Sequence, residues 1–552
     1  MSGLSLRPPD LVMRLDRLGA SHPTRLSFLR AMMRRAFDES WRVERVAWMI
    51  DAAGFGHAVT AVKTPRRTYS LVAFSTPLAD AARTDRVIAE AWDTSFVLYD
   101  GVPDAAEIAR LRINTPLQEA GRFTDRDLIL SRANKSVRLF AYVVDRLAEG
   151  RQPDTDVLDS VGYLMRTTAV YGNGKFGTAD RDRIARRPEF AGPFRAEMLT
   201  VWLIRSFTIG LAEHIAGMRA PARAAALDPD LRRRLGVGNA TGLGMAPFLV
   251  RHPLLMHRWF LARETALARV RALDSAGAPA CAAFCAALAA MRENVRRWKT
   301  GDETQVAETA GLDRDLLALE ENALSILRGG SRPWDALYVY AEQHFTLEGQ
   351  EAAVALMLDP HGDLIDDLAD AMAADEAADT QIDGRMDCGG LRAVTARLYQ
   401  WTEAYDFETP GANARFWYVS QEKLEPRLGE RGAEPGAELE LPLAIARDVT
   451  RLIGALDAQS GDTLVAAFLQ EQPEWRQLVR RIQLCAQNPY AEIRGNLIDA
   501  RMRPIDLLRC KLAFFGASRF DPRSDRWLRI SLFAGEPLPE EIPVRTSAGA
   551  AS

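Results

Sequence analysis

The hydrophobic residues of this chain follow two different periods. Residues 57–64 and 68–75 are rich in β-branched and aromatic side chains, and Pro65, Arg66 and Arg67 form a short connection between them. This arrangement predicts a β-hairpin. Residues 94–100 have the same character and predict a third strand. We therefore expect a small antiparallel sheet, surrounded by helices, in the N-terminal part of the chain.

Helical spacing is expected in most of the remaining chain. An arginine-rich helix follows residues 22–24, and residues 41–53 predict another. Thr124 and Asp127 suit the start of a helix that Gly150 ends after residue 149. Further helices are predicted at residues 156–170, 193–218, 254–273, 279–299 and 313–327. Short loops between them are typical of an all-α body.

The composition shifts at residues 373–390, which are rich in alanine, acidic residues and glycine and predict a linker. Beyond it we expect a helix at residues 391–405, a strand at 414–420, helices from 441 to about 515 and a short strand at 527–533. The predicted units are an α+β region at 1–123, a helical domain at 124–372, a mainly helical domain at 391–545 and a flexible tail at 546–552. The predicted fold class is mainly α with a small antiparallel sheet, α+β overall.

Composition limits the possible partners. The chain has 552 residues, of which 47% are hydrophobic and 26% charged, as in a globular protein. A net charge of −4 lacks the basic excess of nucleic-acid-binding proteins, so no nucleic-acid partner is expected. Five scattered cysteines favour a reducing compartment. Since there is neither a signal peptide nor a membrane-spanning run, we expect a cytoplasmic protein without a membrane partner. A homo-oligomer remains open.

Residues 236–244 form the most glycine-rich segment, G-V-G-N-A-T-G-L-G. Its last seven residues fit a spacing used where backbone amides bind a dinucleotide phosphate, but residues 228–234 before it are helical in character and no βαβ unit follows. This context argues against a dinucleotide fold. The amides of Gly238, Gly242 and Gly244 could still bind an anion, with Asn239 and Thr241 as side-chain donors. Alternatively, the glycines only permit tight packing between helices.

A second segment, residues 171–177, reads Y-G-N-G-K-F-G. It is not a P-loop, because Ala169 and Phe176 occupy the positions that need a glycine and a Ser or Thr. A helix C-cap and turn would explain its glycines. Asn173 and Lys175 are nevertheless candidate ligands for an anion.

Arg132 lies in a cationic stretch of the helix predicted from Thr124. A buried arginine there would need an anionic partner. The hydrophobic residues, however, fall on the opposite side of this predicted helix, which favours a solvent-exposed amphipathic face for Arg132.

Four aspartates, Asp363, Asp366, Asp367 and Asp370, include a D-D-x-x-D pattern that could hold Mg²⁺ against a diphosphate. A second metal-binding segment should accompany it, and none is found. The alternative interpretation, without a metal site, is an acidic helix face that is exposed to solvent.

The candidates for proton transfer are His252, which follows the glycine segment, and Glu422, which lies near an aromatic run. Two arginine- and aspartate-rich stretches, at residues 488–496 and 518–526, are either surface ion pairs or an anion clamp. The histidines have no zinc-ligand spacing.

These features lead to the hypothesis of an enzyme acting on a small anionic molecule: a carboxylate, phosphate or sulfonate. The amides of residues 238–244 and Lys175 would hold the anion, and His252 or Glu422 would move a proton. The sequence identifies no cofactor and no reaction type. The alternatives are a non-catalytic helical scaffold or regulator, and a Mg²⁺-dependent prenyl-diphosphate enzyme using the aspartates.

Overall fold

A computed structural model describes most of the chain. The described residues are 5–77, 93–117, 122–171, 183–239, 253–298, 303–370, 372, 383–403, 416–420, 426–429, 440–442, 445–491, 504–521 and 529–543.

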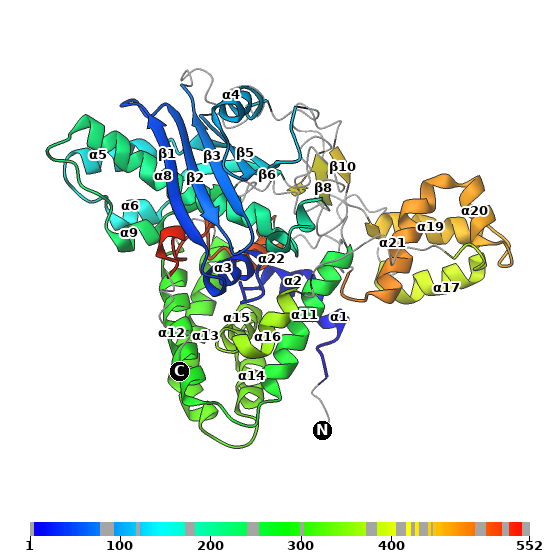
Figure 1. Cartoon of the computed structure of the whole chain (residues 1–552). Helices are drawn as coiled ribbons and strands as arrows, with labels where there is room; N and C mark the ends of the chain where they lie inside the picture. The colour runs from blue at the N-terminus through cyan, green and yellow to red at the C-terminus, as the bar shows by residue number, and fades with distance from the viewer. Residues whose placement is uncertain are drawn as a thin grey trace, which may run out of the picture.

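A large sheet dominates the N-terminal part (Figure 1). Its nine strands lie in the order β1-β2-β3-β4-β5-β6-β7-β12-β11. Their bounds are Arg42–Ile50, Gly56–Lys63, Thr68–Ser75, Thr94–Asp100, Asp127–Lys135, Tyr163–Tyr171 and Gly236–Asn239 for β1 to β7, then Arg519–Asp521 for β11 and Arg529–Leu532 for β12. All neighbours are antiparallel except β6 and β7, which run parallel.

The predicted hairpin and third strand are confirmed. β2 and β3 pair from Gly56↔Ser75 to Lys63↔Thr68, on either side of the Pro-Arg-Arg connection. β4 covers residues 94–100, as expected, and pairs with β3. These strands form because β-branched and aromatic side chains pack well on a pleated surface.

Three predicted helices are instead strands, wholly or in part. Residues 41–53 form β1, an edge strand. The helix expected from Thr124 to residue 149 is β5 followed by the shorter helix α5 (Phe140–Ala148). The helix expected at 156–170 is the single turn α6 (Thr155–Asp159) followed by β6. The sheet is thus larger than the predicted three strands, and the chain after Thr124 is not all-α.

The central strands are covered on both faces. Helix α8 (Arg195–Arg219) lies along one face and connects β6 to β7, with Phe207 packed edge-on against Phe96 of β4 at 5.5 Å. Helix α4 (Ala105–Asn114) covers the other face, where Leu111 packs with Val97 and Leu130. Because both faces are buried, the strands carry continuous apolar runs instead of an alternating pattern.

A helical body lies below the sheet in Figure 1. It consists of α11 (Pro253–Arg271), α12 (Ala278–Arg296), α13 (Glu303–Leu327), α14 (Pro333–His344), α15 (Leu347–Leu358) and α16 (Gly362–Asp370). Segments from both ends of the chain pack with it: α1 (Pro9–Val12), α2 (Leu15–Gly19), α3 (Phe28–Asp38) and α22 (Pro504–Phe515). Sheet and body share one hydrophobic core, which runs from Val12 to Ile542 and crosses the boundary predicted at residue 123.

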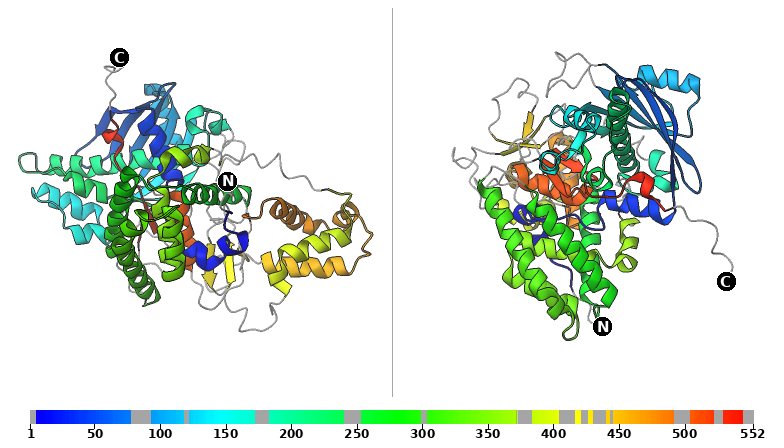
Figure 2. Two further views of the ribbon diagram at one scale, coloured as in Figure 1. Left: turned by 90° about the horizontal axis from the view of Figure 1, so that it is seen from below. Right: turned by 90° about the vertical axis from the view of Figure 1, so that its left-hand side faces the viewer.

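A smaller group of helices stands apart in Figures 1 and 2. It contains α17 (Cys388–Leu398), α18 (Gln400–Glu403), α19 (Ile445–Asp457), α20 (Val465–Glu471) and α21 (Arg476–Gln487). It has its own core, which includes Leu452 and Phe468. Three short strands, β8 (Phe416–Ser420), β9 (Pro426–Gly429) and β10 (Glu440–Pro442), form a separate sheet.

The fold class is therefore as predicted: mainly helical, with a largely antiparallel sheet, α+β overall. All five cysteines lie in described residues and are free thiols. Among the helices in the described parts of the chain, none combines the length and apolar composition needed to cross a lipid bilayer.

Candidate functional site

The carboxyl ends of β6 and β7 lie at the same edge of the large sheet, where the adjacent strands β12 and β5 also have ends, and β6 extends four residues beyond the last residue that pairs with β7. The two strands run parallel, with Thr167 opposite Asn239. β6 ends at Tyr171 and β7 at Asn239, which are also the residues from which the two glycine-rich segments continue. Tyr171 and residue 240 are 69 positions apart in the sequence. The two glycine-rich segments nevertheless continue from neighbouring strands at the same edge.

The third polar stretch, residues 518–526, continues from a strand that ends at the same edge, because β11 covers its described part up to Asp521. Asp521 at the end of β11 pairs with Arg529 at the start of β12, and Ile530 pairs with Asn239. Four described strands, β6, β7, β11 and β12, thus have ends at this edge. The two glycine-rich segments and the third polar stretch continue from three of these ends. In open parallel α/β sheets, ligands bind outside the carboxyl ends of the strands, and β6 and β7 are the parallel pair of this otherwise antiparallel sheet.

Asn239 is the best-defined polar group at this edge. Its side chain is fully buried, and Nδ2 donates to the Thr167 hydroxyl at 3.0 Å. Oδ1 is buried and has no hydrogen-bond partner among the residues that the structure describes. Turning the amide by 180° places Oδ1 on the Thr167 hydroxyl, which can also donate, and leaves Nδ2 without a partner. Asn239 can therefore offer either an acceptor or a donor to a further group.

Gly238 has a packing role that the sequence left open. It lies in the sheet between Arg166 of β6 and Ser531 of β12, and a Cβ atom here would be 2.6 Å from the Tyr163 ring. Gly236 is equally confined, since its Cβ would be 2.3 Å from the Leu532 carbonyl oxygen. The first glycines of the segment thus belong to a strand and allow close packing. The anion contact assigned to Gly238 stays a prediction that this arrangement does not favour.

The predicted helix would place Arg132 on a solvent-exposed face. In the structure Arg132 belongs to a strand, and its side chain is buried. The strand is β5, Arg132 is 6% exposed, and its Nη2 donates to the carbonyl of Leu117 at 2.8 Å. The next residue, Ala133, pairs with Thr167 beside Asn239. Because consecutive strand residues point to opposite faces, Arg132 points toward the α4 side of the sheet, away from Asn239.

The other candidate residues lie outside the described residues: Asn173, Lys175, Thr241, Gly242, Gly244, His252 and Glu422. Sequence reasoning also missed Thr167 as the partner of Asn239, because residues 156–170 were expected to be helical. The β-branched pair Thr167–Thr168, followed by Ala-Val-Tyr, was the signal that could have indicated a strand.

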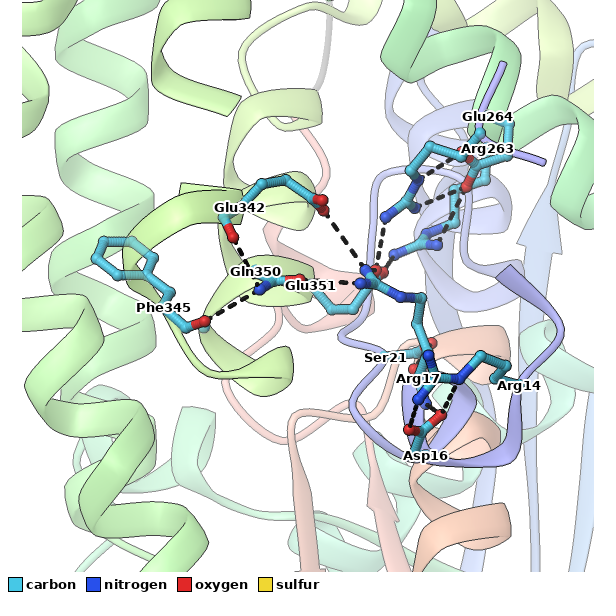
Figure 3. A network of polar contacts seen from close by, with 12 residues as sticks. Arg14, Asp16, Arg17, Ser21, Arg263, Glu264, Glu342, Phe345, Gln350 and Glu351 are labelled. Carbon is cyan, nitrogen blue, oxygen red and sulfur yellow. Dashed lines mark hydrogen bonds and ion pairs between the residues drawn. The ribbon is translucent and has the colours of Figure 1, made fainter. Parts of the chain in front are cut away.

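A buried network of charges beneath the sheet acts as a structural tie. Arg17 and Arg263 converge on Glu351 (Figure 3). Arg7 joins them: Arg7 and Arg17 each lie 2.7 Å from Oε1 of Glu351, and Arg7 also pairs with Glu264 at 2.7 Å. Burial alone would raise the pKa of Glu351, but the three guanidinium groups lower it well below its ordinary value. The network joins the N-terminal segment to α11 and α15, and its carboxylates are fully engaged.

The aspartates of α16 are engaged by arginines as well. Asp366 accepts two hydrogen bonds from Arg25, at 2.7 and 2.8 Å, and Arg34 lies 3.1 Å away. Arg269 pairs with Asp367, and Arg195 pairs with Asp370. The interpretation without a metal expects an acidic face that is exposed to solvent. Instead, Asp366, Asp367 and Asp370 pair with arginines of neighbouring elements. Within the described parts of the chain, no cluster of acidic, His or Cys side chains has the arrangement of a metal site.

Comparisons with known proteins add no identification. The chain matches no family model, no curated protein sequence and no solved structure.

Proposed function

We propose that this protein is a cytoplasmic enzyme acting on a small anionic metabolite, bound at the carboxyl ends of β6 and β7. The observation that supports this most is the shared origin of the two glycine-rich segments. They continue from adjacent parallel strands, with a hydrogen-bonding amide, Asn239, buried at the end of one of them. In open parallel α/β sheets, the carboxyl ends of the strands are the usual position of a ligand site.

In this proposal the residues beyond the strand ends supply the anion contacts. Lys175 and Asn173 follow β6, and Thr241, Gly242 and Gly244 follow β7. An ammonium group, side-chain donors and glycine amides together suit a carboxylate, phosphate or sulfonate. His252 and Glu422 remain the candidates for proton transfer. Arg132 has no part in the site, because it points to the opposite face.

The two alternatives have less support. A diphosphate site on α16 would need aspartates free to bind Mg²⁺, whereas Asp366, Asp367 and Asp370 each pair with an arginine. A scaffold without catalytic function would explain the packing role of Gly236 and Gly238, but not why the strands that lead into all three polar segments end at one edge.

The test is a thermal-shift screen of inorganic phosphate, sulfate and small carboxylates with the wild type and Lys175→Ala. Binding to the folded state raises the melting temperature. Loss of a charge-assisted contact should weaken binding by about 1.5–3 kcal/mol, roughly ten- to a hundredfold, with little change in the melting temperature of the free protein. Lys63→Ala is the matched control, since Lys63 is half-exposed at the end of β2 and pairs only with the surface residue Glu44 among the described residues.

Three outcomes decide the proposal. Stabilisation that Lys175→Ala reduces and Lys63→Ala retains supports the site. No stabilisation of the wild type by any of these anions, or equal stabilisation of both variants, overturns it. A stabilising compound that the wild type leaves chemically unchanged in a long incubation, followed by mass spectrometry, supports a regulator over an enzyme.

A further inference from the structure

A cavity of about 240 Å³ lies in the helical body, away from the edge where β6 and β7 end. Four segments that are distant in sequence form its wall: the residues before α3, helix α12, helix α15 and the end of α22. Most of the wall is apolar, with contributions from Ala287, Met291, Val295, Leu356 and Leu512. A cavity of about 150 Å³ with apolar walls can hold benzene, so this one has room for a ring with a short substituent.

The charged groups in the wall are already paired. Arg30 lies 2.7 Å from Asp359 and 3.4 Å from Glu536. Arg509 is bound by Glu348 and lies 3.3 Å from Glu308. An anionic ligand would have to compete with these carboxylates, so the charge pattern favours an uncharged occupant.

His22 is the polar group in the wall that lacks a partner. Its side chain is 5% exposed, lines the cavity, and has an Nε2 atom without a hydrogen bond among the described residues. Burial and the nearby Arg509 lower its pKa to about 4, so the ring is neutral at physiological pH. A neutral imidazole has one donor and one acceptor, and leaving either unpaired in the interior is unfavourable.

Asn294 gives the wall a second polar group. It lies one turn before Trp298, whose ring is parallel to that of His22 at a centroid distance of 6.4 Å. The polar side chains thus occur together with flat aromatic surfaces, while alanines and Met291 form the apolar part. This division predicts a ligand with an apolar body and one polar end.

We propose that this cavity binds a small, uncharged, largely apolar molecule whose hydroxyl or carbonyl group hydrogen-bonds to the imidazole of His22. The site is separate from the anion site proposed at the sheet edge, because none of the proposed anion ligands lines the cavity, and Ser518, which does line it, precedes β11 at the end opposite to Asp521. It would take an alcohol, a phenol or a neutral carbonyl compound about the size of a substituted benzene.

The experiment compares benzyl alcohol, benzoate and toluene as probes in titration calorimetry and thermal shift with the full-length protein. Benzyl alcohol should bind at least tenfold more tightly than benzoate, which has the same ring but a charge. His22→Phe keeps a ring in the wall but removes the hydrogen bond, so it should weaken benzyl alcohol at least fivefold without weakening toluene.

Ala287→Phe should abolish binding of benzyl alcohol by filling the cavity. Ala282→Phe is the matched control, because Ala282 is exposed on the same helix, outside the cavity wall, and binding should be unchanged. Equal binding to the two alanine variants, benzoate binding as tight as that of benzyl alcohol, or no binding of benzyl alcohol up to its solubility limit would each overturn the proposal. If His22→Phe does not fold, the probe series on the wild type and the alanine pair still decide it.

Discussion

Glu351 is the residue on which the N-terminal segment and the helical body depend together. Three guanidinium groups surround its fully buried carboxylate, those of Arg7, Arg17 and Arg263. Buried charges such as these are stable only as a complete set, because a cation left without its partner retains the cost of its desolvation.

We therefore predict that Glu351→Gln lowers the free energy of unfolding by about 3–5 kcal/mol, as expected when one member of a buried ion pair is removed. Glu149→Gln is the control, because Glu149 is half-exposed and 3.5 Å from Arg146, and should cost less than about 1 kcal/mol. Urea denaturation of the two variants measures the difference. A loss of similar size in both would contradict the structural role assigned to the network.

Two buried histidines make stability depend on pH. Burial, together with Arg509 for His22 and Arg258 for His257, lowers the pKa of each to about 4 from an ordinary value of 6.5. The unfolded chain therefore takes up protons below about pH 6.5 that the folded chain does not bind until about pH 4. These groups do not affect the free energy of unfolding above about pH 6.5. As the pH is lowered from about 6.5 to about 4, they decrease it.

The expected loss approaches about 1.4 kcal/mol per pH unit for each histidine. It can be measured as the free energy of unfolding in urea at about pH 7, 6 and 5, above the range where most carboxylates titrate. His22→Phe should reduce the slope by up to about 1.4 kcal/mol per pH unit, because one of the histidines with a lowered pKa is gone, while His257 and His361 keep their contributions. An unchanged slope would show that His22 is not held neutral by the fold.

At the scale of elements, the sequence predicts some strands well and others not at all. β2, β3 and β4 were recognised because a marked turn and β-branched runs define them. β5 and β6 were assigned to helices, because strands buried on both faces have continuous apolar runs that periodicity cannot distinguish from a buried helix segment. β1 was lost because its mixed polar and apolar residues also fit an amphipathic helix.

These misassignments also affected the candidate site. The helix expected at residues 156–170 hides β6, and the helical character of residues 228–234 gives no sign of β7, so the parallel pair β6–β7 is not predicted. Asn239 stays a predicted ligand, and its hydrogen-bond partner Thr167 comes from another strand. Strand order is a tertiary property that a single sequence without an alignment does not contain.

The close packing of β7 gives a prediction at this scale. Gly238→Ala should destabilise the protein by about 1–3 kcal/mol, because its Cβ would overlap the Tyr163 ring at 2.6 Å. Gly454→Ala is the control, since Gly454 lies in α19 with nothing within 4 Å of an added Cβ, and should stabilise by about 0.5–1 kcal/mol. Thermal denaturation measures both. A Gly238→Ala variant as stable as the wild type would contradict the packing role of Gly238 and favour a functional reason for this glycine.

At the scale of the whole molecule, the large core joins the sheet, the helical body and both ends of the chain, and a second core holds the group from α17 to α21. Met372 still belongs to the first core and Cys388, the first residue of α17, to the second; the linker at residues 373–390 stays a prediction. This arrangement brings Asp521, near the end of the chain, to the same sheet edge as the strand ends from which the two glycine-rich segments continue.

The central claim is that an anion binds where β6 and β7 end, and anomalous diffraction from crystals soaked in selenate tests it most directly. Selenate replaces sulfate or phosphate, and its selenium can be located without ambiguity. The account predicts a peak just beyond Asn239, within reach of Lys175. Selenate found only elsewhere, for example at the arginines around Asp159, with no peak at this edge, would contradict it.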